Sequence, residues 1–343
     1  MGSTISDVAK AAGLSTATVS KYLNHKPVSS QNMERISAAI EALDYHVNDF
    51  ARGLRTAMSM TIGLLVPSTN NIFSISLIEQ VEQLLVRDNY SIFYCQYGND
   101  SKKLTEKLAF LRMKKVDGII MLACAQPTDQ TIQSMKQLQE DGIPIVFVNG
   151  KIDGIQADTV LVDTISSIYE SIRVLILRGH RKIGMFALSP NIWNTREREQ
   201  GYRRAFEDHQ MTYEERLIRT EGKGELDQQT LRQEATDFLN RNPDMTALLL
   251  PGYQLTLAGL YALSESGKMI GRDIAVIGYD CADICDLVHP GLAYVSIPAE
   301  KIAGYAVDLL LSSMRQEERP IRLVRIPSVL VSGGSLDCEL KLT

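Results

Sequence analysis

"GLSTATVSKYLNHK", residues 13–26, carries four hydroxyl side chains before its tyrosine, two lysines and no carboxylate. The whole chain of 343 residues has a formal net charge of -5 at pH 7. Residues 1–56 hold six Lys or Arg and five Asp or Glu, a net charge of +1, which leaves -6 for the rest. This difference is slight, so charge alone does not identify a nucleic-acid-binding head.

Three short helices are predicted in the first 45 residues. The first covers "DVAKAA", capped by Ser6 and ending at Gly13. The second covers "ATVSKYL", capped by Ser15 or Thr16 and ending near Asn24. Two residues and a capping hydroxyl separate them, which is the length of the corner in a helix-turn-helix unit.

The third helix is predicted to begin at Ser29 or Ser30. Val19 and Leu23 of the second helix face the core of this small head, which leaves that helix free to enter a groove. The apolar residues of the third helix follow the i, i+3, i+4, i+7 spacing of one buried face; they are Ile36, Ala39, Ile40 and Leu43.

The segment "NDFARGLRTAMS", residues 48–59, is predicted to be a linker with a brief helix. This helix is shorter than the roughly 12 residues that an isolated helix needs, and Gly53 costs it about 0.5–1 kcal/mol relative to alanine. We therefore expect it to order only when a second copy and DNA support it.

From residue 62 onward, short apolar strands alternate with amphipathic helices, a pattern typical of parallel sheets covered on both faces. The strands fall into two groups, before and after about residue 158. They predict two α/β lobes with a ligand-binding cleft at the carboxyl ends of the strands. The predicted strands are "IGLLV", "SIFYCQ", "GIIML", "IPIVFV", "KIGMFAL", "TALLL" and "DIAVIGY".

Composition favours a cytoplasmic protein. The N-terminus lacks the charged and apolar regions of a signal peptide, and no uncharged apolar run approaches about 18 residues. An odd number of scattered cysteines argues against a disulfide framework; they are Cys95, Cys124, Cys281, Cys285 and Cys338.

Up to about Ser335, the chain resembles the LacI/GalR family of bacterial transcriptional regulators. The resemblance lies in the order and separation of several motifs: "TISDVAKAAGLSTATVSKYLN", "ARGLRT" followed by "TIGLLVP", "VDGII", "LILRGHRKIGMF", "REREQGYRRAF", "DIAVIGYD" and "LLLSSM".

The resemblance implies an α/β protein with an N-terminal all-α head. The helix-turn-helix domain would cover residues 1–46, and the hinge helix and linker 47–60. Residues 61–343 would form a two-lobed periplasmic-binding-protein type I core with parallel sheets. The N-lobe is expected at about 61–158 plus 291–321, and the C-lobe at about 159–290 plus 322–335.

The function implied by the resemblance is that of a sequence-specific DNA-binding repressor, which binds a palindromic operator as a homodimer. A small molecule between the lobes, a sugar or sugar derivative, would control its DNA affinity. No enzymatic activity, cofactor or membrane association is expected. Two alternatives stay open: control by a protein corepressor, and a solute-binding protein without DNA function.

The family pattern assigns base contacts to Thr16, Ala17 and Lys21. Lysine stands where arginine is common, so a point charge replaces a bidentate fork. Leu54 matches the leucine that hinge helices insert into the minor groove. The alternative is that these residues are helix caps, a solvated face and a linker leucine. Further DNA contacts are expected from Ser15, Thr18, Ser20, Asn24, Asn48, Ala51 and Arg55.

In the core, Arg196 matches the family's effector arginine and Asp280 its hydroxyl-binding carboxylate, a pair suited to a polyol or sugar acid. The alternative is that both form surface ion pairs. Gly252 and Tyr253 stand where Asn and Asp are usual, which weakens the case for an ordinary hexose as the effector. The other expected effector contacts are Asn71, Phe73, Ser74, Asn149, Asp163 and Trp193.

Competing chemistry has little support. Cys281, Cys285 and His289 follow an i, i+4, i+8 spacing that suits a soft metal, but Pro290 makes a regular helix through them doubtful. No metal site and no catalytic residues are therefore predicted.

Overall fold

The computed structural model describes residues 3–23, 27–45, 58–98, 100–123, 127–187, 193–219, 227–315 and 320–338, with only the backbone at Trp193 and Asn194. The chain separates into two compact units, Met1–Ser59 and Met60–Thr343. The second unit contains two lobes with separate sheets.

The head begins with helix α1 (Ile5–Ala12), and its start differs from the predicted one. Thr4, not Ser6, is the N-cap: its side chain accepts from the Asp7 N–H, and the Asp7 carboxylate accepts from the Thr4 N–H at 2.9 Å. This reciprocal capping box satisfies two helix-end donors, whereas Ser6 already lies inside the first turn. Gly13 ends the helix in a left-handed conformation (φ 62°), as predicted.

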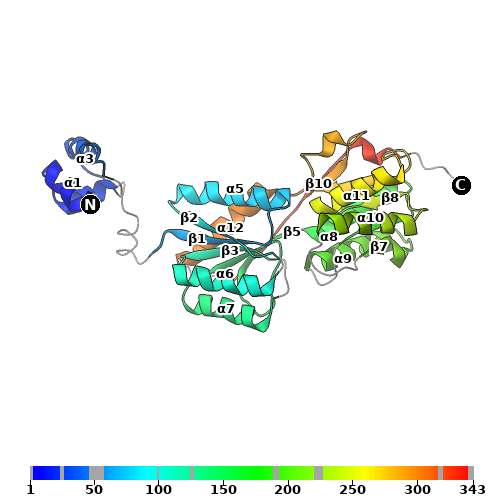
Figure 1. Ribbon diagram of the computed structural model, residues 1–343, viewed down its shortest axis with the longest axis horizontal. Coiled ribbons are helices and arrows are strands. Elements are labelled where there is room, and N and C mark those ends of the chain that lie inside the picture. The colour runs from blue at the N-terminus through cyan, green and yellow to red at the C-terminus, as the bar shows by residue number, and fades with distance from the viewer. Residues whose placement is uncertain are drawn as a thin grey trace. The chain divides into compact units, whose positions relative to one another are not determined.

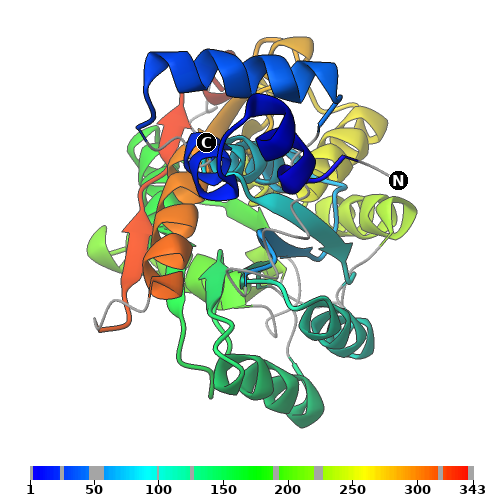
Figure 2. The same ribbon diagram turned by 90° about the vertical axis from the view of Figure 1, so that its left-hand side faces the viewer.

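Helices α2 (Thr16–Leu23) and α3 (Ser30–Ala42) complete the head (Figure 2). The Ser15 hydroxyl accepts from the Thr18 N–H at 3.2 Å, and the Ser29 side chain caps α3. Both caps are among the predicted alternatives. One small core joins the three helices; its buried members are Val8, Ala9, Ala12, Val19, Ile36 and Ala39.

The N-lobe is built on an entirely parallel sheet in the order β11-β5-β4-β3-β1-β2. Figure 1 shows strands β1 and β3 between helix α5 on one side and helices α6 and α7 on the other. Helix α12 packs against α5 and along the sheet. The strands are β1 (Thr61–Val66), β2 (Ser91–Gln96), β3 (Gly118–Leu122), β4 (Ile145–Val148), β5 (Asp158–Val162) and β11 (Leu323–Ile326). The helices are α5 (Ile72–Arg87), α6 (Ser101–Lys114), α7 (Asp129–Glu140) and α12 (Ala299–Met314).

The C-lobe sheet has the order β12-β10-β9-β8-β6-β7, with only the β10–β12 pair antiparallel. Helices α8 and α9 pack together, as do α10 and α11, and separate apolar clusters involve the two pairs. The strands are β6 (Ile183–Phe186), β7 (Ile218–Arg219), β8 (Ala247–Leu249), β9 (Ala275–Tyr279), β10 (Ala293–Ser296) and β12 (Val329–Val331). The helices are α8 (Thr164–Leu177), α9 (Trp193–Asp208), α10 (Gln228–Arg241) and α11 (Tyr253–Ser266).

The predicted lobe boundaries are wrong for three strands. Strands β5 and β11 belong to the N-lobe sheet, although 159–290 and 322–335 were expected in the C-lobe. Strand β10 belongs to the C-lobe sheet, although 291–321 was expected in the N-lobe. The chain crosses between the lobes after β5, after β10 and after β11. Because β10 and β11 have four residues each and are partly exposed, their apolar pattern is weak in the sequence.

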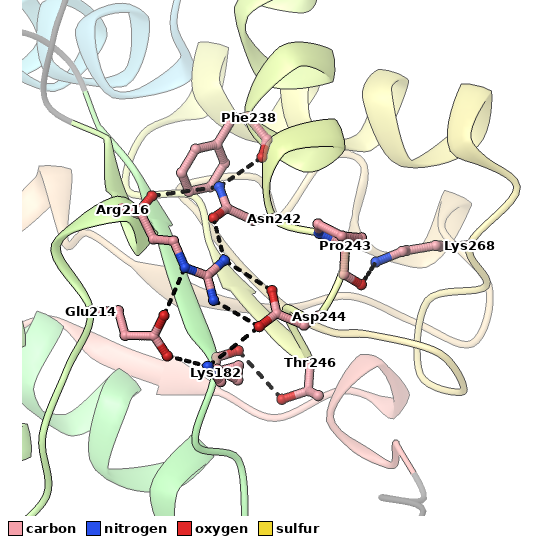
Figure 3. A network of polar contacts seen from close by, with 9 residues as sticks. All are labelled: Lys182, Glu214, Arg216, Phe238, Asn242, Pro243, Asp244, Thr246 and Lys268. Atoms are coloured by element: carbon pink, nitrogen blue, oxygen red, sulfur yellow. Dashed lines mark hydrogen bonds and ion pairs between the residues drawn. The ribbon is translucent and has the colours of Figure 1, made fainter.

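A network of charged side chains ties the amino ends of the C-lobe strands together (Figure 3). The Arg216 guanidinium donates to both Asp244 oxygens at 2.9 and 2.7 Å and to Glu214 at 2.7 Å. Lys182, directly before β6, pairs with the same two carboxylates. Hydrogen bonds from Arg216 and Lys182 hold the pKa of Asp244 far below its usual range. Buried Asn242 accepts from Arg216 at 2.8 Å and donates to the Phe238 carbonyl at 2.9 Å.

Substitution of two helical glycines by alanine is predicted to change stability in opposite directions. A Cβ at Gly201 in α9 would lie 2.5 Å from the Ile165 carbonyl oxygen, so Gly201→Ala forces α8 and α9 apart. We expect it to lower the free energy of unfolding by about 1–3 kcal/mol. In α12, Gly304 has open space around its Cβ position, so Gly304→Ala should raise that free energy by about 0.5–1 kcal/mol.

Urea unfolding of the two variants and the parent chain measures both effects. A Gly201→Ala variant as stable as Gly304→Ala would contradict the close packing of α8 on α9.

Candidate functional site

The first turn of α2 is an exposed surface without carboxylates. Ser15, Thr16, Ala17 and Lys21 are exposed, while Val19 on the opposite side is fully buried. The Ser15 and Thr18 hydroxyl oxygens lie 2.9 Å apart, so the two side chains fix each other. Short hydroxyls and a lysine on an accessible helix end can approach phosphates and base edges closely.

The other predicted DNA contacts are less fully described. Thr18 and Ser20 are partly buried on α2. Asn24, Asn48, Ala51, Leu54 and Arg55 lie outside the described residues, so their roles stay predictions.

In the core, strand order marks where each sheet can bind a ligand. The order reverses between β1 and β3 in the N-lobe and between β6 and β8 in the C-lobe. Open α/β sheets bind ligands outside the carboxyl ends of the strands at such reversals. The segments after β1, β6 and β8 lead into α5, α9 and α11, respectively.

The segment after β1 places the three predicted N-lobe residues together. Asn71 caps α5, its Oδ1 accepting from the Ser74 N–H at 2.8 Å. Phe73 is buried, and the buried Ser74 Oγ has no hydrogen-bond partner among the described residues. The capping of α5 therefore accounts for the Asn71 oxygen, whereas no contact among the described residues accounts for the buried Ser74 hydroxyl.

Two contacts bring this end of the N-lobe against the C-lobe. The Gln254 side chain at the start of α11 donates to the Asn70 carbonyl. Arg325 of β11 forms an ion pair with Glu197 of α9 at 2.8 Å. The carboxyl ends of the two sheets thus meet at one junction, and neither Gln254 nor the Arg325–Glu197 pair was predicted from the sequence.

Asp280, directly after β9, lies at this junction in a left-handed conformation (φ 50°). Burial, with a smaller effect from Asp283, raises the pKa of Asp280 to about 6. The backbone N–H groups of Ile297 and Phe73, from the two lobes, oppose that shift. Its Oδ2 is buried and has no partner within the described part of the chain, so this oxygen is available to a ligand.

The structure places a different arginine at the junction from the one predicted. Arg196 is exposed and lines a surface hollow of about 430 Å³ along one face of α9, with Gln200 and Arg203. Arg198 instead shares the i, i+4, i+7 face of Tyr202 and Ala205, which are fully buried. The helical period of this buried face is the signal that would have identified Arg198.

Arg198 occupies a desolvated position next to the ends of two strands. Desolvation lowers its pKa to about 10, and a charge interaction with Tyr279, the last residue of β9, opposes this shift. A Cβ built on Gly252, directly before α11, would lie 4.0 Å from an Arg198 guanidinium nitrogen. Arg198 therefore replaces Arg196 as the candidate effector arginine.

Three of the remaining predicted effector residues lie just after the strands β8, β4 and β5. Tyr253 begins α11 and donates to Asp283 at 2.9 Å. Asn149 follows β4 in a left-handed conformation (φ 56°). Asp163 follows β5 and caps α8 through the Ser166 N–H, at 3.3 Å. The side chain of Trp193 lies outside the described residues.

Nothing in the described residues assembles a metal site. Cys285 lies in a three-residue 3-10 turn, so no regular helix aligns it with Cys281 and His289. No group of three metal-ligating His, Cys, Asp or Glu side chains occurs in the described ranges. Among those ranges there is also no helix with the length and apolar character needed to cross a membrane.

A helix-turn-helix head on a two-lobed core with polar groups at the lobe junction defines a ligand-responsive DNA-binding regulator. The model of bacterial regulatory proteins of the lacI family matches residues 4–48, and the model of the periplasmic binding protein-like domain matches residues 172–336. The HTH-type transcriptional repressor PurR of Proteus mirabilis (strain HI4320) is 30% identical over 336 residues, 97% of this chain and 96% of that protein. The chain belongs to the lacI family, and it is a DNA-binding transcriptional regulator whose core is of the effector-binding type.

Solved structures agree with this assignment. The transcriptional regulator CelR in complex with cellobiose is 26% identical with a TM-score of 0.72, covering 97% of this chain and 99% of that one. The lac repressor dimer bound to operator and the anti-inducer ONPF has a TM-score of 0.81 at 23% identity, with coverages of 98% and 99%, and supports the fold. PurR of Vibrio atlanticus (strain LGP32) is 29% identical over 97% of this chain and 98% of its own. The alternative of a solute-binding protein without DNA function is thereby excluded.

The position of Asp280 predicts a distinctive pH dependence of stability. Its pKa in the folded chain, about 6, exceeds the ordinary value of 3.8, so folding takes up a proton between these values. Lowering the pH from 7 to 5 should therefore stabilise the parent chain relative to Asp280→Asn, by about 1 kcal/mol.

Urea unfolding of both proteins at pH 7 and 5 tests this. Burial lowers the pKa of His180 to about 4, which destabilises the chain in acid, but this effect is common to both proteins and cancels in the comparison. Equal pH dependence of the two proteins would show that Asp280 is not desolvated.

Proposed function

We propose that this protein represses transcription by binding a palindromic operator as a homodimer in the cytoplasm, and that a small molecule between its lobes sets the affinity for DNA. The observation that carries the proposal is the exposed, carboxylate-free start of α2 on a lacI-type head. We assign no enzymatic activity to the chain. The proposal of a dimeric repressor is supported by relatives named as transcriptional repressors and by a lac repressor solved as a dimer on its operator.

In this proposal α2 enters the major groove. Thr16, Ala17 and Lys21 contact base edges, since they lie on the exposed side of the helix. The hydroxyls of Ser15, Thr18 and Ser20 position the helix against phosphates, as does Asn24. The two heads of a dimer would read half-sites about one helical turn apart.

The hinge residues contribute a second contact in the minor groove. Leu54 would insert between base steps, with Asn48, Ala51 and Arg55 along the backbone. A hinge that folds only on DNA makes the affinity sensitive to how the two cores are arranged.

The effector site is proposed at the lobe junction, around Arg198 and Asp280. Arg198 donates hydrogen bonds, and the unpartnered Asp280 oxygen accepts them. Phe73 and Ser74 supply an apolar wall and a hydroxyl from the N-lobe, with Asn71 and Tyr253 at its edge. Solved regulators in complex with cellobiose and with ribose support a small polar molecule as ligand.

Ligand control follows from the contacts between the lobes. A molecule held by both lobes favours one of their relative arrangements, which the Arg325–Glu197 pair and the Gln254–Asn70 contact also constrain. When the arrangement of the lobes changes, the point at which the core joins the hinge segment also moves. Ligand binding and DNA binding are thereby coupled. Coupling of about 1–3 kcal/mol is typical of such systems.

Operator binding provides the first test. Using an operator selected from random duplexes, Lys21→Ala should weaken binding by about 10-fold to 100-fold and relax preference at the contacted base pair. Lys103→Ala, an exposed lysine on α6 of the core, serves as the control and should change affinity little. Band-shift titrations at several salt concentrations measure both.

Two outcomes would contradict the DNA-binding roles: retention of no duplex at moderate salt, or equal losses for Lys21→Ala and Lys103→Ala. If DNA binding stands but no small molecule alters it, control by a protein corepressor replaces the ligand part of the proposal.

A further inference from the structure

The C-lobe surface carries an apolar hollow that the proposed effector site does not use. It has a volume of about 670 Å³ and lies between the end of α11, the turn at 268–272 and the segment 287–290. Two of its lining side chains are strongly exposed, Leu287 at 81% and Met269 at 44%. Exposed apolar side chains gathered in one concave surface indicate an interaction site. The other apolar side chains of the lining include Leu260, Leu263, Ile270 and Val288.

The charged side chains of this hollow are of one sign. Lys268 and Arg272 line it together with His289, and none of the described carboxylates does. Lys268 donates to the Pro243 carbonyl at 3.1 Å (Figure 3), and Arg272 pairs with Asp273 at 3.1 Å, which anchors both cations beside the hollow. An apolar occupant with an acidic residue at one end complements such a lining.

The chain reaches the edge of the hollow at the last residue that the structure describes. The Cys338 thiol donates to the Arg272 carbonyl at 3.1 Å. Four residues earlier, a Cβ built on Gly334 would lie 2.6 Å from the Pro290 carbonyl oxygen, so this segment packs directly on a second lining residue. The chain is therefore held against the lining immediately before residue 339.

The residues that follow have the chemistry that the hollow requires. Residues 339–343 read "ELKLT", in which Leu340 and Leu342 alternate with Glu339 and Lys341. In an extended segment this period of two places both leucines on one side and both charges on the other. At about 3.3 Å per extended residue, Leu342 can lie up to about 13 Å from Cys338, which brings both leucines within reach of the lining.

We infer that residues 339–343 bind as an extended segment in this hollow, with both leucines against its apolar lining and Glu339 beside Arg272. Attachment at Cys338 gives the segment an effective concentration in the millimolar range, so modest apolar burial is enough for occupancy. A separate molecule of the same chemistry lacks this advantage. The bound segment joins the turn at 268–272 to the segment 287–290, which connects β9 to β10.

Hydrogen–deuterium exchange of the full chain tests this inference. Leu340→Ser combined with Leu342→Ser should speed exchange of the backbone amides in 268–272 and 287–289 by at least about fivefold, because the segment no longer covers them. Lys341→Ser, on the other side of the segment, is the matched control and should leave this exchange unchanged. Leu287→Ser changes a side chain that is too exposed to support folding. It should match the double variant, and combining all three changes should add little.

Each outcome decides for or against the bound segment. Faster exchange in the leucine variants but not in Lys341→Ser, at low and high protein concentration alike, supports the inference. Equal effects of Lys341→Ser and the leucine changes overturn the apolar contact. Unchanged exchange in the leucine variants overturns the binding of residues 339–343. In that case, protection that rises with protein concentration assigns the hollow to a second copy of the chain, and protection that does not rise leaves the hollow open.

Discussion

The organisation of the core depends on where the chain passes from one sheet to the other. It crosses after β5, after β10 and after β11, so the two lobes are joined by three neighbouring connections rather than one flexible linker. Contacts such as Gln254 with the Asn70 carbonyl and Arg325 with Glu197 hold the carboxyl ends of both sheets together at one junction. The junction around Asp280 then becomes the place where a bound molecule can select one arrangement.

Local signals predicted most of the fold. Alternating apolar strands and amphipathic helices predicted two parallel α/β lobes, because burial on both faces leaves continuous apolar runs such as "IGLLV". The sequence did not predict strands β10 and β11, because both are short and partly exposed. Which sheet they join is decided by chain crossings that local pattern does not encode. The start of α1 was misplaced for a simpler reason: Thr4 and Asp7 form a capping box, and that pair outweighs a single serine.

The candidate sites show the same division between local and non-local information. The exposed start of α2 was predictable because helix period and capping chemistry are local. At the effector site, matching a motif selected Arg196, whereas the buried face of α9 passes through Arg198, Tyr202 and Ala205. Contacts across the junction, such as Gln254 with the Asn70 carbonyl, join residues far apart in the chain and leave no pattern in the sequence.

The charged network at the amino ends of β6 and β8 has a consequence for how this protein can change over evolutionary time. Arg216, Asp244 and Asn242 secure the end of the C-lobe opposite the lobe junction. Residues at the other end, including Gly252 and Asp280, are correspondingly relieved of that task. If the junction binds the effector as proposed, substitutions there change which molecule is recognised while the network keeps the scaffold in place, so a regulator of this architecture can acquire a new chemical signal.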